Sequence, residues 1–463
     1  TFHETIRVKG AKSFDLKVVE TAFGTRMPAI TGPDAKLSLA WTAHLPGALT
    51  LGLGEMAAVA DTASAVAILN HAGLPAENAL IADSQGHIAW TIAGRMPDKH
   101  LDNGCDRTAP SRIPPPPGAP PPPGMALPAA PADSSCTPWN GWADNNPRII
   151  DPPSHRLWSA NNRVSDGADL AAIGNSGYDL GARAKQIRDD LFASNRFNER
   201  DLLAIQLDDR ALFLQRWWQQ LRALVQGSKD PVLQRIEAAT RQWNPRAGAD
   251  AVSYRIVRAW RAAVLSRVQD GLMAPAEVKL GKDFSMPGLS QLEGVAWELI
   301  TQRPANLLPR KFWTCAANTP EADCAKFGWN ALLADAAHDA AASLEKHGPL
   351  AQRTWGERNT AAICHPLAAA LPGALHSLLC MPAEQLPGDS NMPRVAAPNF
   401  GASERMVVSP GHEADGIIEM PGGQSGNPLS PFWGAGHEAW VRGEPTPFMP
   451  GTTVHTLHMV PTH

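Results

Sequence analysis

The sequence predicts an α+β fold, because segments typical of strands lie toward both ends of the chain and segments typical of helices lie between them. Apolar and polar residues alternate near the N-terminus and again within 391–463, as they do in strands with one buried face. Across 186–390, apolar residues recur instead at helical spacing. We therefore expect one body of 463 residues whose sheet is completed by both ends of the chain.

The first part of the chain, residues 1–110, is expected to contribute strands. Apolar residues alternate with polar ones over 6–8 and 14–18, on either side of a turn at 9–12, which predicts a β-hairpin. Further strands are expected at 36–42, 79–83 and 87–92, and a helix of small residues at about 55–71.

Residues 111–135 are predicted to form a loop insertion. Two runs of four prolines, Pro114–Pro117 and Pro120–Pro123, favour an extended polyproline II conformation, which does not belong in a core. We favour a solvated insertion over a ligand for a proline-binding domain.

The centre of the chain, 186–390, is expected to be mainly helical. Apolar residues between 214 and 225 recur at i, i+3, i+4, i+7, i+10 and i+11, and Gly227 follows as a stop signal. The pair Trp217–Trp218 in this stripe is interpreted as core rather than as a platform for a ligand. Further helices are expected at about 250–270 and 329–347, and C-terminal strands at 406–408 and 417–420.

Composition excludes several classes of function. The chain has 41 Lys and Arg against 45 Asp and Glu, a net charge of −4, so it lacks the basic footprint of a nucleic-acid-binding protein. Hydrophobic residues make up 44%, which is enough for a large core. There is no apolar run of about 18 residues, and residues 1–5 lack the pattern of a signal peptide. We expect neither nucleic acid nor a membrane among the partners.

Six cysteines fall into three sequence-neighbour pairs, and none lies in the C-x-x-C motif of a thiolate metal site. We favour disulfides that close local loops, since the first of them would bracket the proline-rich insertion. These pairs are Cys105–Cys136, Cys315–Cys324 and Cys364–Cys380. Disulfides indicate an oxidising compartment, the periplasm or the cell exterior; the alternative is six buried thiols in a cytosolic protein.

The sequence motifs of several common enzymes are absent. The chain contains no G-x-S-x-G, P-loop, G-x-G-x-x-G or H-E-x-x-H motif. Residues 343–346 match S-x-x-K, but the K-T-G and S-D-N motifs of a β-lactamase are missing, and the tetrapeptide ends a predicted helix. The motifs therefore predict no cofactor, no metal cluster and no Ser-His-Asp triad.

One constellation carries a chemical signal. An Asn-Asn pair begins at Asn161, and Arg183 lies 22 positions after it. This spacing resembles the penicillin acylase family of N-terminal-nucleophile amidohydrolases, in which the first Asn donates its side-chain amide to the oxyanion and an Arg behind it supports the site. The resemblance implies these roles for Asn161 and Arg183. A fixed amide suits the role, because acyl transfer puts negative charge on the former carbonyl oxygen.

Other blocks resemble the same family, in the same order and across nearly the whole chain. They are Asn78, Ala82-Asp83, Gly86, Ile88, Gly94 and Pro97; Trp139, Trp142, Pro147-Arg148 and Pro152-Pro153; Trp355-Gly356-Glu357, His365-Pro366-Leu367 and Leu386-Pro387-Gly388-Asp389; and Phe400-Gly401-Ala402-Ser403 and Gly423-Gln424-Ser425-Gly426-Asn427-Pro428.

The resemblance implies part of an αββα N-terminal-nucleophile sandwich with a large helical excursion, in which 136–185 carries Asn161 and Arg183. Family members use the first residue of their β chain, a Ser, as nucleophile, and its own α-amine as base. In register with the family, that Ser would precede Thr1, which implies a companion chain from the same precursor. Thr1 as the nucleophile is the alternative, although the residues after it align with a later hairpin.

Three more positions take their interpretation from the resemblance. Trp41 falls where the family has an aromatic wall of its acyl pocket, although a core Trp at a strand end is the alternative. Glu77 falls near a pocket position that is apolar in penicillin G acylases, where a carboxylate would disfavour a purely apolar pocket. The structural calcium of some members lacks its expected Asp, because Ala172 stands there and Asp169 is a weak substitute.

Taken together, the resemblance implies the large chain of a periplasmic or secreted amidohydrolase acting on small-molecule amides. Substrates would be penicillin-type side-chain amides, N-acyl-homoserine lactones or both, cleaved through an acyl-enzyme. Two alternatives stay open: a periplasmic binding or scaffold protein that has lost the nucleophile, and an autonomous hydrolase that uses Thr1.

Overall fold

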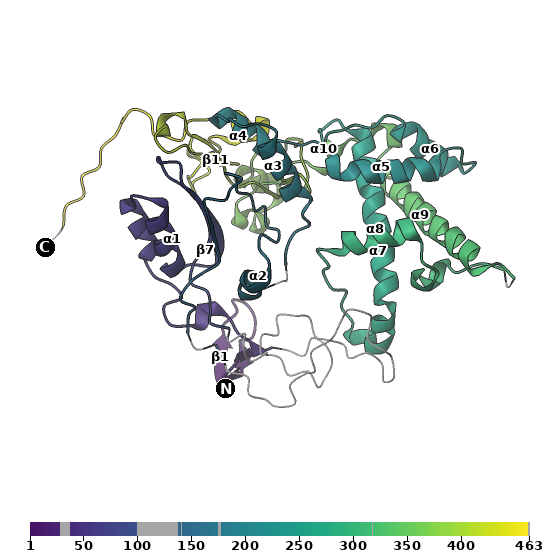
Figure 1. Cartoon of the computed structure of the whole chain (residues 1–463), viewed down its shortest axis with the longest axis horizontal. Helices are drawn as coiled ribbons and strands as arrows, with labels where there is room; N and C mark the ends of the chain where they lie inside the picture. Colours follow the sequence, from purple (N-terminus) through teal and green to yellow (C-terminus); the bar gives the residue numbers. More distant parts are fainter. Residues whose placement is uncertain (28–37, 100–137, 140, 175–176, 317, 462–463) are drawn as a thin grey trace. The chain divides into compact units, whose positions relative to one another are not determined.

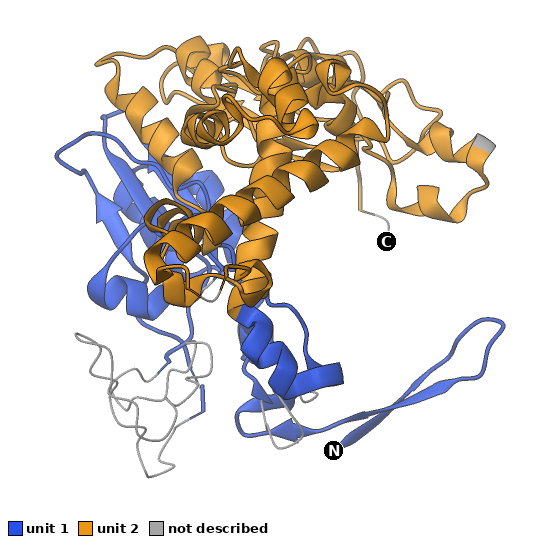
Figure 2. Ribbon diagram, turned by 90° about the vertical axis from the view of Figure 1, so that its right-hand side faces the viewer, with its two compact units in different colours: residues 1–179, 273–290 blue, residues 180–272, 291–463 orange. Residues whose placement is uncertain are grey.

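The computed structural model describes residues 1–27, 38–99, 138–139, 141–174, 177–316 and 318–461 (Figure 1). They divide into two compact units (Figure 2). Unit 1 takes residues 1–179 and 273–290, and unit 2 takes 180–272 and 291–463. The expected proline-rich insertion and the pair Cys105–Cys136 lie outside the described residues.

Unit 1 begins with the predicted hairpin. Strands β1 (Phe2–Ile6) and β2 (Phe14–Val18) pair antiparallel, with Phe2 opposite Val18 and Ile6 opposite Phe14. A small antiparallel sheet follows, in the order β3-β4-β5. Its strands are β3 (Glu20–Thr21), β4 (Gly24–Arg26) and β5 (Ser38–Leu39), the last within the range predicted for a strand.

The main sheet of unit 1 is antiparallel, in the order β6-β7-β8. Its strands are β6 (Glu77–Ala82), β7 (Ile88–Ala93) and β8 (Arg148–Ile150). Helix α1 (Thr62–His71) packs against it, beside the buried strand β7 (Figure 1). Trp90, Ile92 and Met96 form a small core in this unit. Helix α2 (Gly167–Ile173) follows β8 in the chain, and its residues Ala172 and Ile173 pack against this core.

The helix expected at about 55–71 is two elements in the structure. A 3₁₀ helix, η2 (Gly52–Ala58), precedes α1, and the chain is extended at Asp61 between them. The Asp61 carboxylate accepts from the N–H of Ser64 at 2.7 Å, so it caps α1 at its start. A capping residue in the middle of the predicted helix is the physical reason for the break.

Unit 2 contains most of the helices, as predicted for the centre of the chain. The helices from α3 on are α3 (Ala182–Phe192), α4 (Glu199–Gln206), α5 (Leu212–Val225), α6 (Pro231–Thr240), α7 (Val252–Leu280), α8 (Leu292–Gln302), α9 (Glu321–Glu345), α10 (Trp355–Arg358), α11 (Gly373–His376) and α12 (His437–Arg442). Among the described residues, the 3₁₀ helices besides η2 are η1 (Thr42–His44), η4 (Gly281–Asp283), η5 (Ala305–Leu307), η6 (Arg310–Phe312), η7 (Leu350–Gln352), η8 (Pro366–Ala370), η9 (Ser377–Leu379) and η10 (Glu413–Asp415). The last turns of α7, from Met273, are assigned to unit 1.

A tryptophan-rich core holds these helices together. Trp217 on α5 is fully buried and meets Trp260 of α7 and Trp297 of α8 edge to face, at centroid distances of 5.6 and 5.3 Å. Its indole N–H donates to Glu293 at 2.7 Å, which satisfies the polar atom of a buried ring. Trp218 is partly buried against the same core. The predicted core stripe on α5 is therefore confirmed.

Short strands close unit 2. β9 (Ala396–Ala397) pairs with β10 (Phe400–Gly401), and β11 (Arg405–Val407) pairs with β12 (Ile417–Glu419). The last two coincide with the predicted C-terminal strands. Among the described residues, these C-terminal strands pair with one another and not with the strands near the N-terminus. The single sheet that both chain ends were expected to complete stays a prediction.

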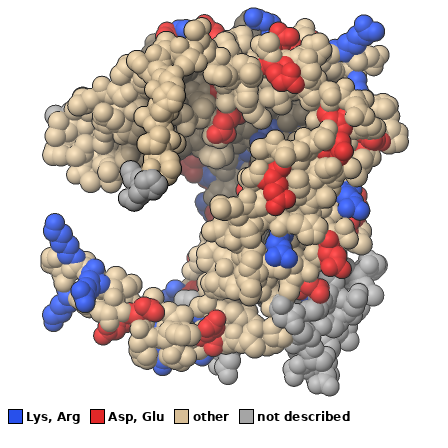
Figure 3. All heavy atoms as spheres, turned by 90° about the vertical axis from the view of Figure 1, so that its left-hand side faces the viewer, with Lys and Arg blue, Asp and Glu red and all other residues tan. Residues whose placement is uncertain are grey.

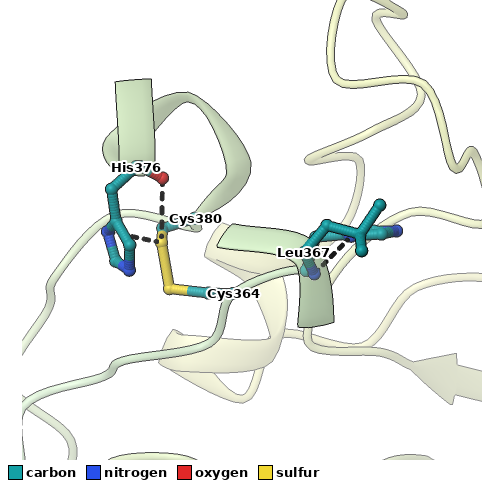
Figure 4. The surroundings of a disulfide bond; sticks show 5 residues. Cys364, Leu367, His376 and Cys380 are labelled. Atoms are coloured by element: carbon teal, nitrogen blue, oxygen red, sulfur yellow. Dashed lines mark hydrogen bonds between the residues drawn. A yellow bond between two sulfur atoms is a disulfide. The ribbon is translucent and has the colours of Figure 1, made fainter. Parts of the chain in front are cut away.

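Two disulfides lie in unit 2, and both are pairs that the sequence analysis favoured. Cys315 bonds to Cys324 in the first turn of α9, and Cys364 bonds to Cys380 after η9. Figure 4 shows His376 beside the second bond, with its carbonyl oxygen 3.4 Å and its Nδ1 3.6 Å from the Sγ of Cys380. These two disulfides staple short loops within unit 2.

The surface has a mixed charge. On the face in Figure 3, acidic and basic side chains are scattered among uncharged ones, as a net charge of −4 leads one to expect. Among the described residues, no helix combines the length and the apolar character that crossing a membrane requires.

Candidate active site

Asn161 lies in unit 1, on the segment between β8 and α2. Its φ is 58° and that of Ala160 is 56°, so both residues adopt the left-handed conformation. This conformation costs Ala160 about 1–2 kcal/mol and costs Asn161 less, because a short polar side chain tolerates it. Asp151 and His155 also have positive φ values, 46° and 51°. Five non-glycine residues in the described part of the chain have a positive φ, and the one outside this segment is Arg303. Backbone strain is therefore concentrated just before Asn161, as it often is at functional sites.

Local hydrogen bonds hold this strained backbone. The N–H of Asp179 donates to the carbonyl oxygen of Asn161 at 2.9 Å, which ties the segment before α2 to the segment after it. When the amide of Asn162 is assigned from its neighbours, its nitrogen donates to the carbonyl of Ser159 at 2.7 Å. The Asn161 side chain itself is exposed. These bonds therefore hold the backbone from which the Asn161 side chain extends.

Arg183 lies in the first turn of α3 in unit 2 and is half-buried. Its helix is anchored by the buried residues Ala184 and Gln186, and the Gln186 amide donates to Asp208. Since Asn161 and Arg183 belong to different units, the predicted support of one by the other stays a prediction.

A polar network in unit 1 anchors the strand end that leads to Asn161. Asp83 follows β6 and accepts from the N–H and the hydroxyl of Thr62 at 3.2 and 2.8 Å, and from the N–H groups of Gln85 and His87. It joins the start of α1 to the β6–β7 turn. Asp151 follows β8, and its carboxylate accepts from the N–H of Ile88 at 3.0 Å and meets Nδ1 of His87 at 2.8 Å.

The electrostatics of this network favour charged side chains. Desolvation opposes ionisation of Asp83, but the hydrogen bonds from Thr62, His87 and Gln85 outweigh it and lower the pKa of Asp83 to about 2. The hydrogen bond to Asp151 raises the pKa of His87, and the negative charges of Asp151 and Asp83 raise it further. The N–H of Ile88 and then His87 lower the pKa of Asp151. Around pH 5 to 6 the pair is ionic.

Other residues that the sequence analysis singled out are exposed. Trp41 is 56% exposed, directly before η1, with its ring edge to face with His44 at 5.2 Å. Glu77 is the exposed first residue of β6, opposite Ala93. Asp169 is exposed on α2, and Thr1 is exposed ahead of β1.

Among the described residues near α2, few side chains offer the carboxylate oxygens that calcium binds. Ala172, which stands where the family has a ligand, packs partly buried against the core of Trp90 instead of offering an oxygen. Asp169 belongs to no cluster of three potential ligand side chains in the described part of the chain. Within the described residues, Asp169 therefore lacks neighbouring carboxylates of the kind that calcium sites use.

Sequence reasoning missed the residues that position the site. His87, Asp151 and Asp179 were not singled out, because each makes its decisive contact with a residue distant in sequence. A weak signal was present, since Asp151 stands between a strand and Pro152-Pro153, where a side chain that hydrogen-bonds to backbone is common.

Comparison with known proteins now decides the family. The family model described as penicillin amidase matches residues 1–452. The chain belongs to the penicillin amidase family.

Two curated relatives give the family context. The chain is 25% identical to the penicillin acylase 2 proenzyme of Pseudomonas sp. strain SE83, over 94% of this chain and 52% of that protein. It is 24% identical to the acyl-homoserine lactone acylase QuiP of Pseudomonas aeruginosa, over 81% of this chain and 44% of that protein. The chain therefore spans about half the length of the curated relatives it matches.

A solved structure gives the fold. Thermostable penicillin G acylase from Alcaligenes faecalis matches 99% of this chain and 82% of its own, with a TM-score of 0.53 at 14% identity. This likeness, with the family, identifies the fold as that of an N-terminal-nucleophile hydrolase with mixed helix and sheet. The αββα layering stays a prediction.

Proposed function

We propose that this chain is the large part of an amidohydrolase that cleaves the amide of penicillin-type side chains, of N-acyl-homoserine lactones or of both. The observation that carries the proposal is Asn161, an exposed amide on a strained backbone that Asp179 holds by its carbonyl. Evolution tolerates strain of this kind where a side chain must be aimed. The relatives named above are acylases for these two substrate classes.

The proposed reaction is acyl transfer through an acyl-enzyme. A seryl oxygen adds to the substrate carbonyl carbon, and its proton passes to the free α-amine of the same Ser. Negative charge then collects on the former carbonyl oxygen, where the Asn161 amide donates a hydrogen bond. Collapse breaks the C–N bond and the amine leaves with the proton. Water attacks the acyl-enzyme by the same route and releases the acid.

The nucleophile is proposed to reside on a companion polypeptide from the same precursor. Two observations support this part. One relative is a proenzyme, of which this chain matches about half. The β1–β2 hairpin also exposes apolar side chains, among them Phe2, Ile6 and Phe14 at 53, 47 and 57%. A two-stranded hairpin is marginal alone in water, so a further polypeptide would stabilise it.

Pocket and location complete the proposal. We assign Trp41 to the wall of the acyl pocket, since an exposed ring at a strand end offers a flat apolar surface. Glu77 would limit how apolar that pocket is. The two disulfides support a periplasmic or secreted enzyme, since such bonds persist in oxidising compartments.

The experiment is N-terminal sequencing and intact mass of every chain in the natively purified protein, followed by an amidase assay of Thr1→Ala. A companion chain that begins with Ser, with full activity of the variant, is the expected result. Loss of activity in Thr1→Ala would instead make Thr1 the nucleophile. Absence of both a Ser-initiated chain and any amidase activity would leave a binding or scaffold protein.

A further inference from the structure

A cavity of about 480 Å³ lies within unit 2, among α7, the end of α9, α10 and the residues after Gly388. Its size suits a small molecule. Arg255, Arg258 and Arg358 line it, together with His347. Among the described residues of its lining, Asp389 is the only carboxylate.

Asp389 is fully engaged by its neighbours. One oxygen accepts from the Tyr254 hydroxyl at 2.8 Å and from Nε of Arg258 at 2.7 Å, and the other accepts from the N–H of Ser390 at 2.7 Å. A carboxylate with this many donors has little capacity left for a ligand. Arg258 donates to Asp389 through Nε alone. Within the described part of the chain, its two terminal nitrogens donate to no other protein group.

The second carboxylate nearby is shared by two arginines. Glu357 pairs with Arg255 at 2.8 Å and with Arg353 at 3.3 Å. Arg358 is exposed and, in the described portion of the protein, forms no ion pair. Three arginines of the lining and Arg353 beside them therefore stand against two carboxylates, Asp389 and Glu357. Burial lowers the pKa of Arg255, and the positive charges of Arg353 and Arg358 lower it further against the attraction of Glu357.

Apolar groups make up much of the remaining lining, including Leu344, Trp355 and Pro398. Trp355 is held in place, since its indole N–H donates to the carbonyl of Gly388 at 2.8 Å. Surplus positive charge in a partly enclosed space attracts an anion. Apolar atoms beside it favour an anion that carries hydrocarbon, because burying that hydrocarbon adds binding free energy.

We propose that this cavity binds a small organic carboxylate with an apolar body, and that Arg258 and Arg358 hold the carboxylate. Guanidinium groups suit this ligand, since their donors match the two oxygens of a carboxylate. The binding site does not depend on the proposed amidase activity, and its test reads binding rather than turnover.

The first experiment measures how fast phenylglyoxal modifies individual arginines in the natively purified protein, by peptide mass mapping, with octanoate as the probe. Arg310 is the matched control, because it is exposed on the same unit and, among the described residues, has no ion pair either. Octanoate at about ten times its Kd should slow modification of Arg358 about tenfold and leave Arg310 unchanged. Octanoate bound elsewhere would not shield Arg358, so the rate reports on this cavity.

Two further probes test the ligand class. Acetate should need at least a tenfold higher concentration for the same protection, because it lacks the apolar body. Equal protection by acetate or by inorganic phosphate would overturn the assignment of an apolar carboxylate, and equal modification rates with and without octanoate would overturn the site.

A pair of variants gives an independent readout. Arg358→Gln should weaken octanoate binding about tenfold in isothermal titration calorimetry, while Arg310→Gln removes the same charge without effect. Arg358 makes no ion pair with a described residue, so its variant should fold normally. The same octanoate affinity in both variants would refute the role of Arg358.

Discussion

The N–H of Asp179, which follows α2 in the sequence, donates to the carbonyl oxygen of Asn161, which precedes α2, at 2.9 Å. This bond fixes the carbonyl side of a residue whose φ is already confined to the left-handed region. The proposed oxyanion role of Asn161 requires a backbone held in this way, because a preorganised donor stabilises the developing charge without rearranging.

Asn161→Ala should lower kcat of amide hydrolysis on the order of 10²–10³-fold, because an oxyanion donor acts mainly in the transition state. KM should change little. The measurement is steady-state kinetics with an N-acyl amide, with Asn195→Ala as control on an exposed loop of unit 2. Near-normal turnover in a folded Asn161→Ala enzyme would contradict the assignment.

Ala160→Gly should stabilise the protein by up to about 1 kcal/mol, since glycine adopts a φ of 56° without the strain that a Cβ adds. The matched control is Ala171→Gly in α2, which should destabilise by about 1 kcal/mol because its backbone is helical. Chemical denaturation compares the two. Equal losses in both variants would show that residue 160 carries no strain.

The His87–Asp151 pair should make stability depend on pH. The pKa of His87 is raised in the folded state, so its contribution is present below the ordinary histidine value of about 6.5 and is lost as pH rises through the higher folded value. The pKa of Asp151 is lowered, so its contribution is lost only as pH falls below the ordinary aspartate range.

The pair is therefore strongest at about pH 5 to 6. His87→Gln should lower the melting temperature more at pH 5.5 than at pH 8.5, and His71→Gln, in the same unit, serves as the control. A loss that is the same at both pH values would argue against an ionic pair.

Removing either disulfide should destabilise the protein by about 2–4 kcal/mol, because the unfolded chain gains freedom. The variants are Cys315→Ser with Cys324→Ser, and Cys364→Ser with Cys380→Ser. Thermal unfolding measures the loss, and mass spectrometry with and without reduction counts thiols. Free thiols at these four positions in the native protein would overturn both the bonds and the proposed location.

The buried pair Arg405–Glu419 should tolerate joint replacement better than single replacement. The Arg405 guanidinium and the Glu419 carboxylate lie 2.6 Å apart, and each residue is 2% exposed. Arg405 also donates to the carbonyl of Trp440. Glu419→Gln should cost about 3–5 kcal/mol of unfolding free energy, because it leaves a buried charge unpaired. Arg405→Met combined with Glu419→Leu should cost less, and denaturation midpoints compare the variants.

Much of the architecture was predictable because it depends on local patterns. Alternation placed the β1–β2 hairpin and the strands β6 and β7, and helical spacing placed α5 with its buried Trp217. The boundary error at α1 came from Asp61, whose capping contact outweighs the helical preference of the residues around it. Patterns of this kind act within a few residues, so a sequence reveals them.

The sequence by itself determined the α+β composition, two of the local disulfides and, through an ordered series of blocks, the family. It also identified Asn161 as a candidate site residue, because its spacing of 22 positions to Arg183 can be read from the sequence. Only the tertiary structure decided that Asp179 holds Asn161, that His87 meets Asp151, and that arginines from α7 and α10 gather around one cavity. The physical reason is that these contacts join residues far apart in sequence, and no local pattern encodes which distant groups will meet.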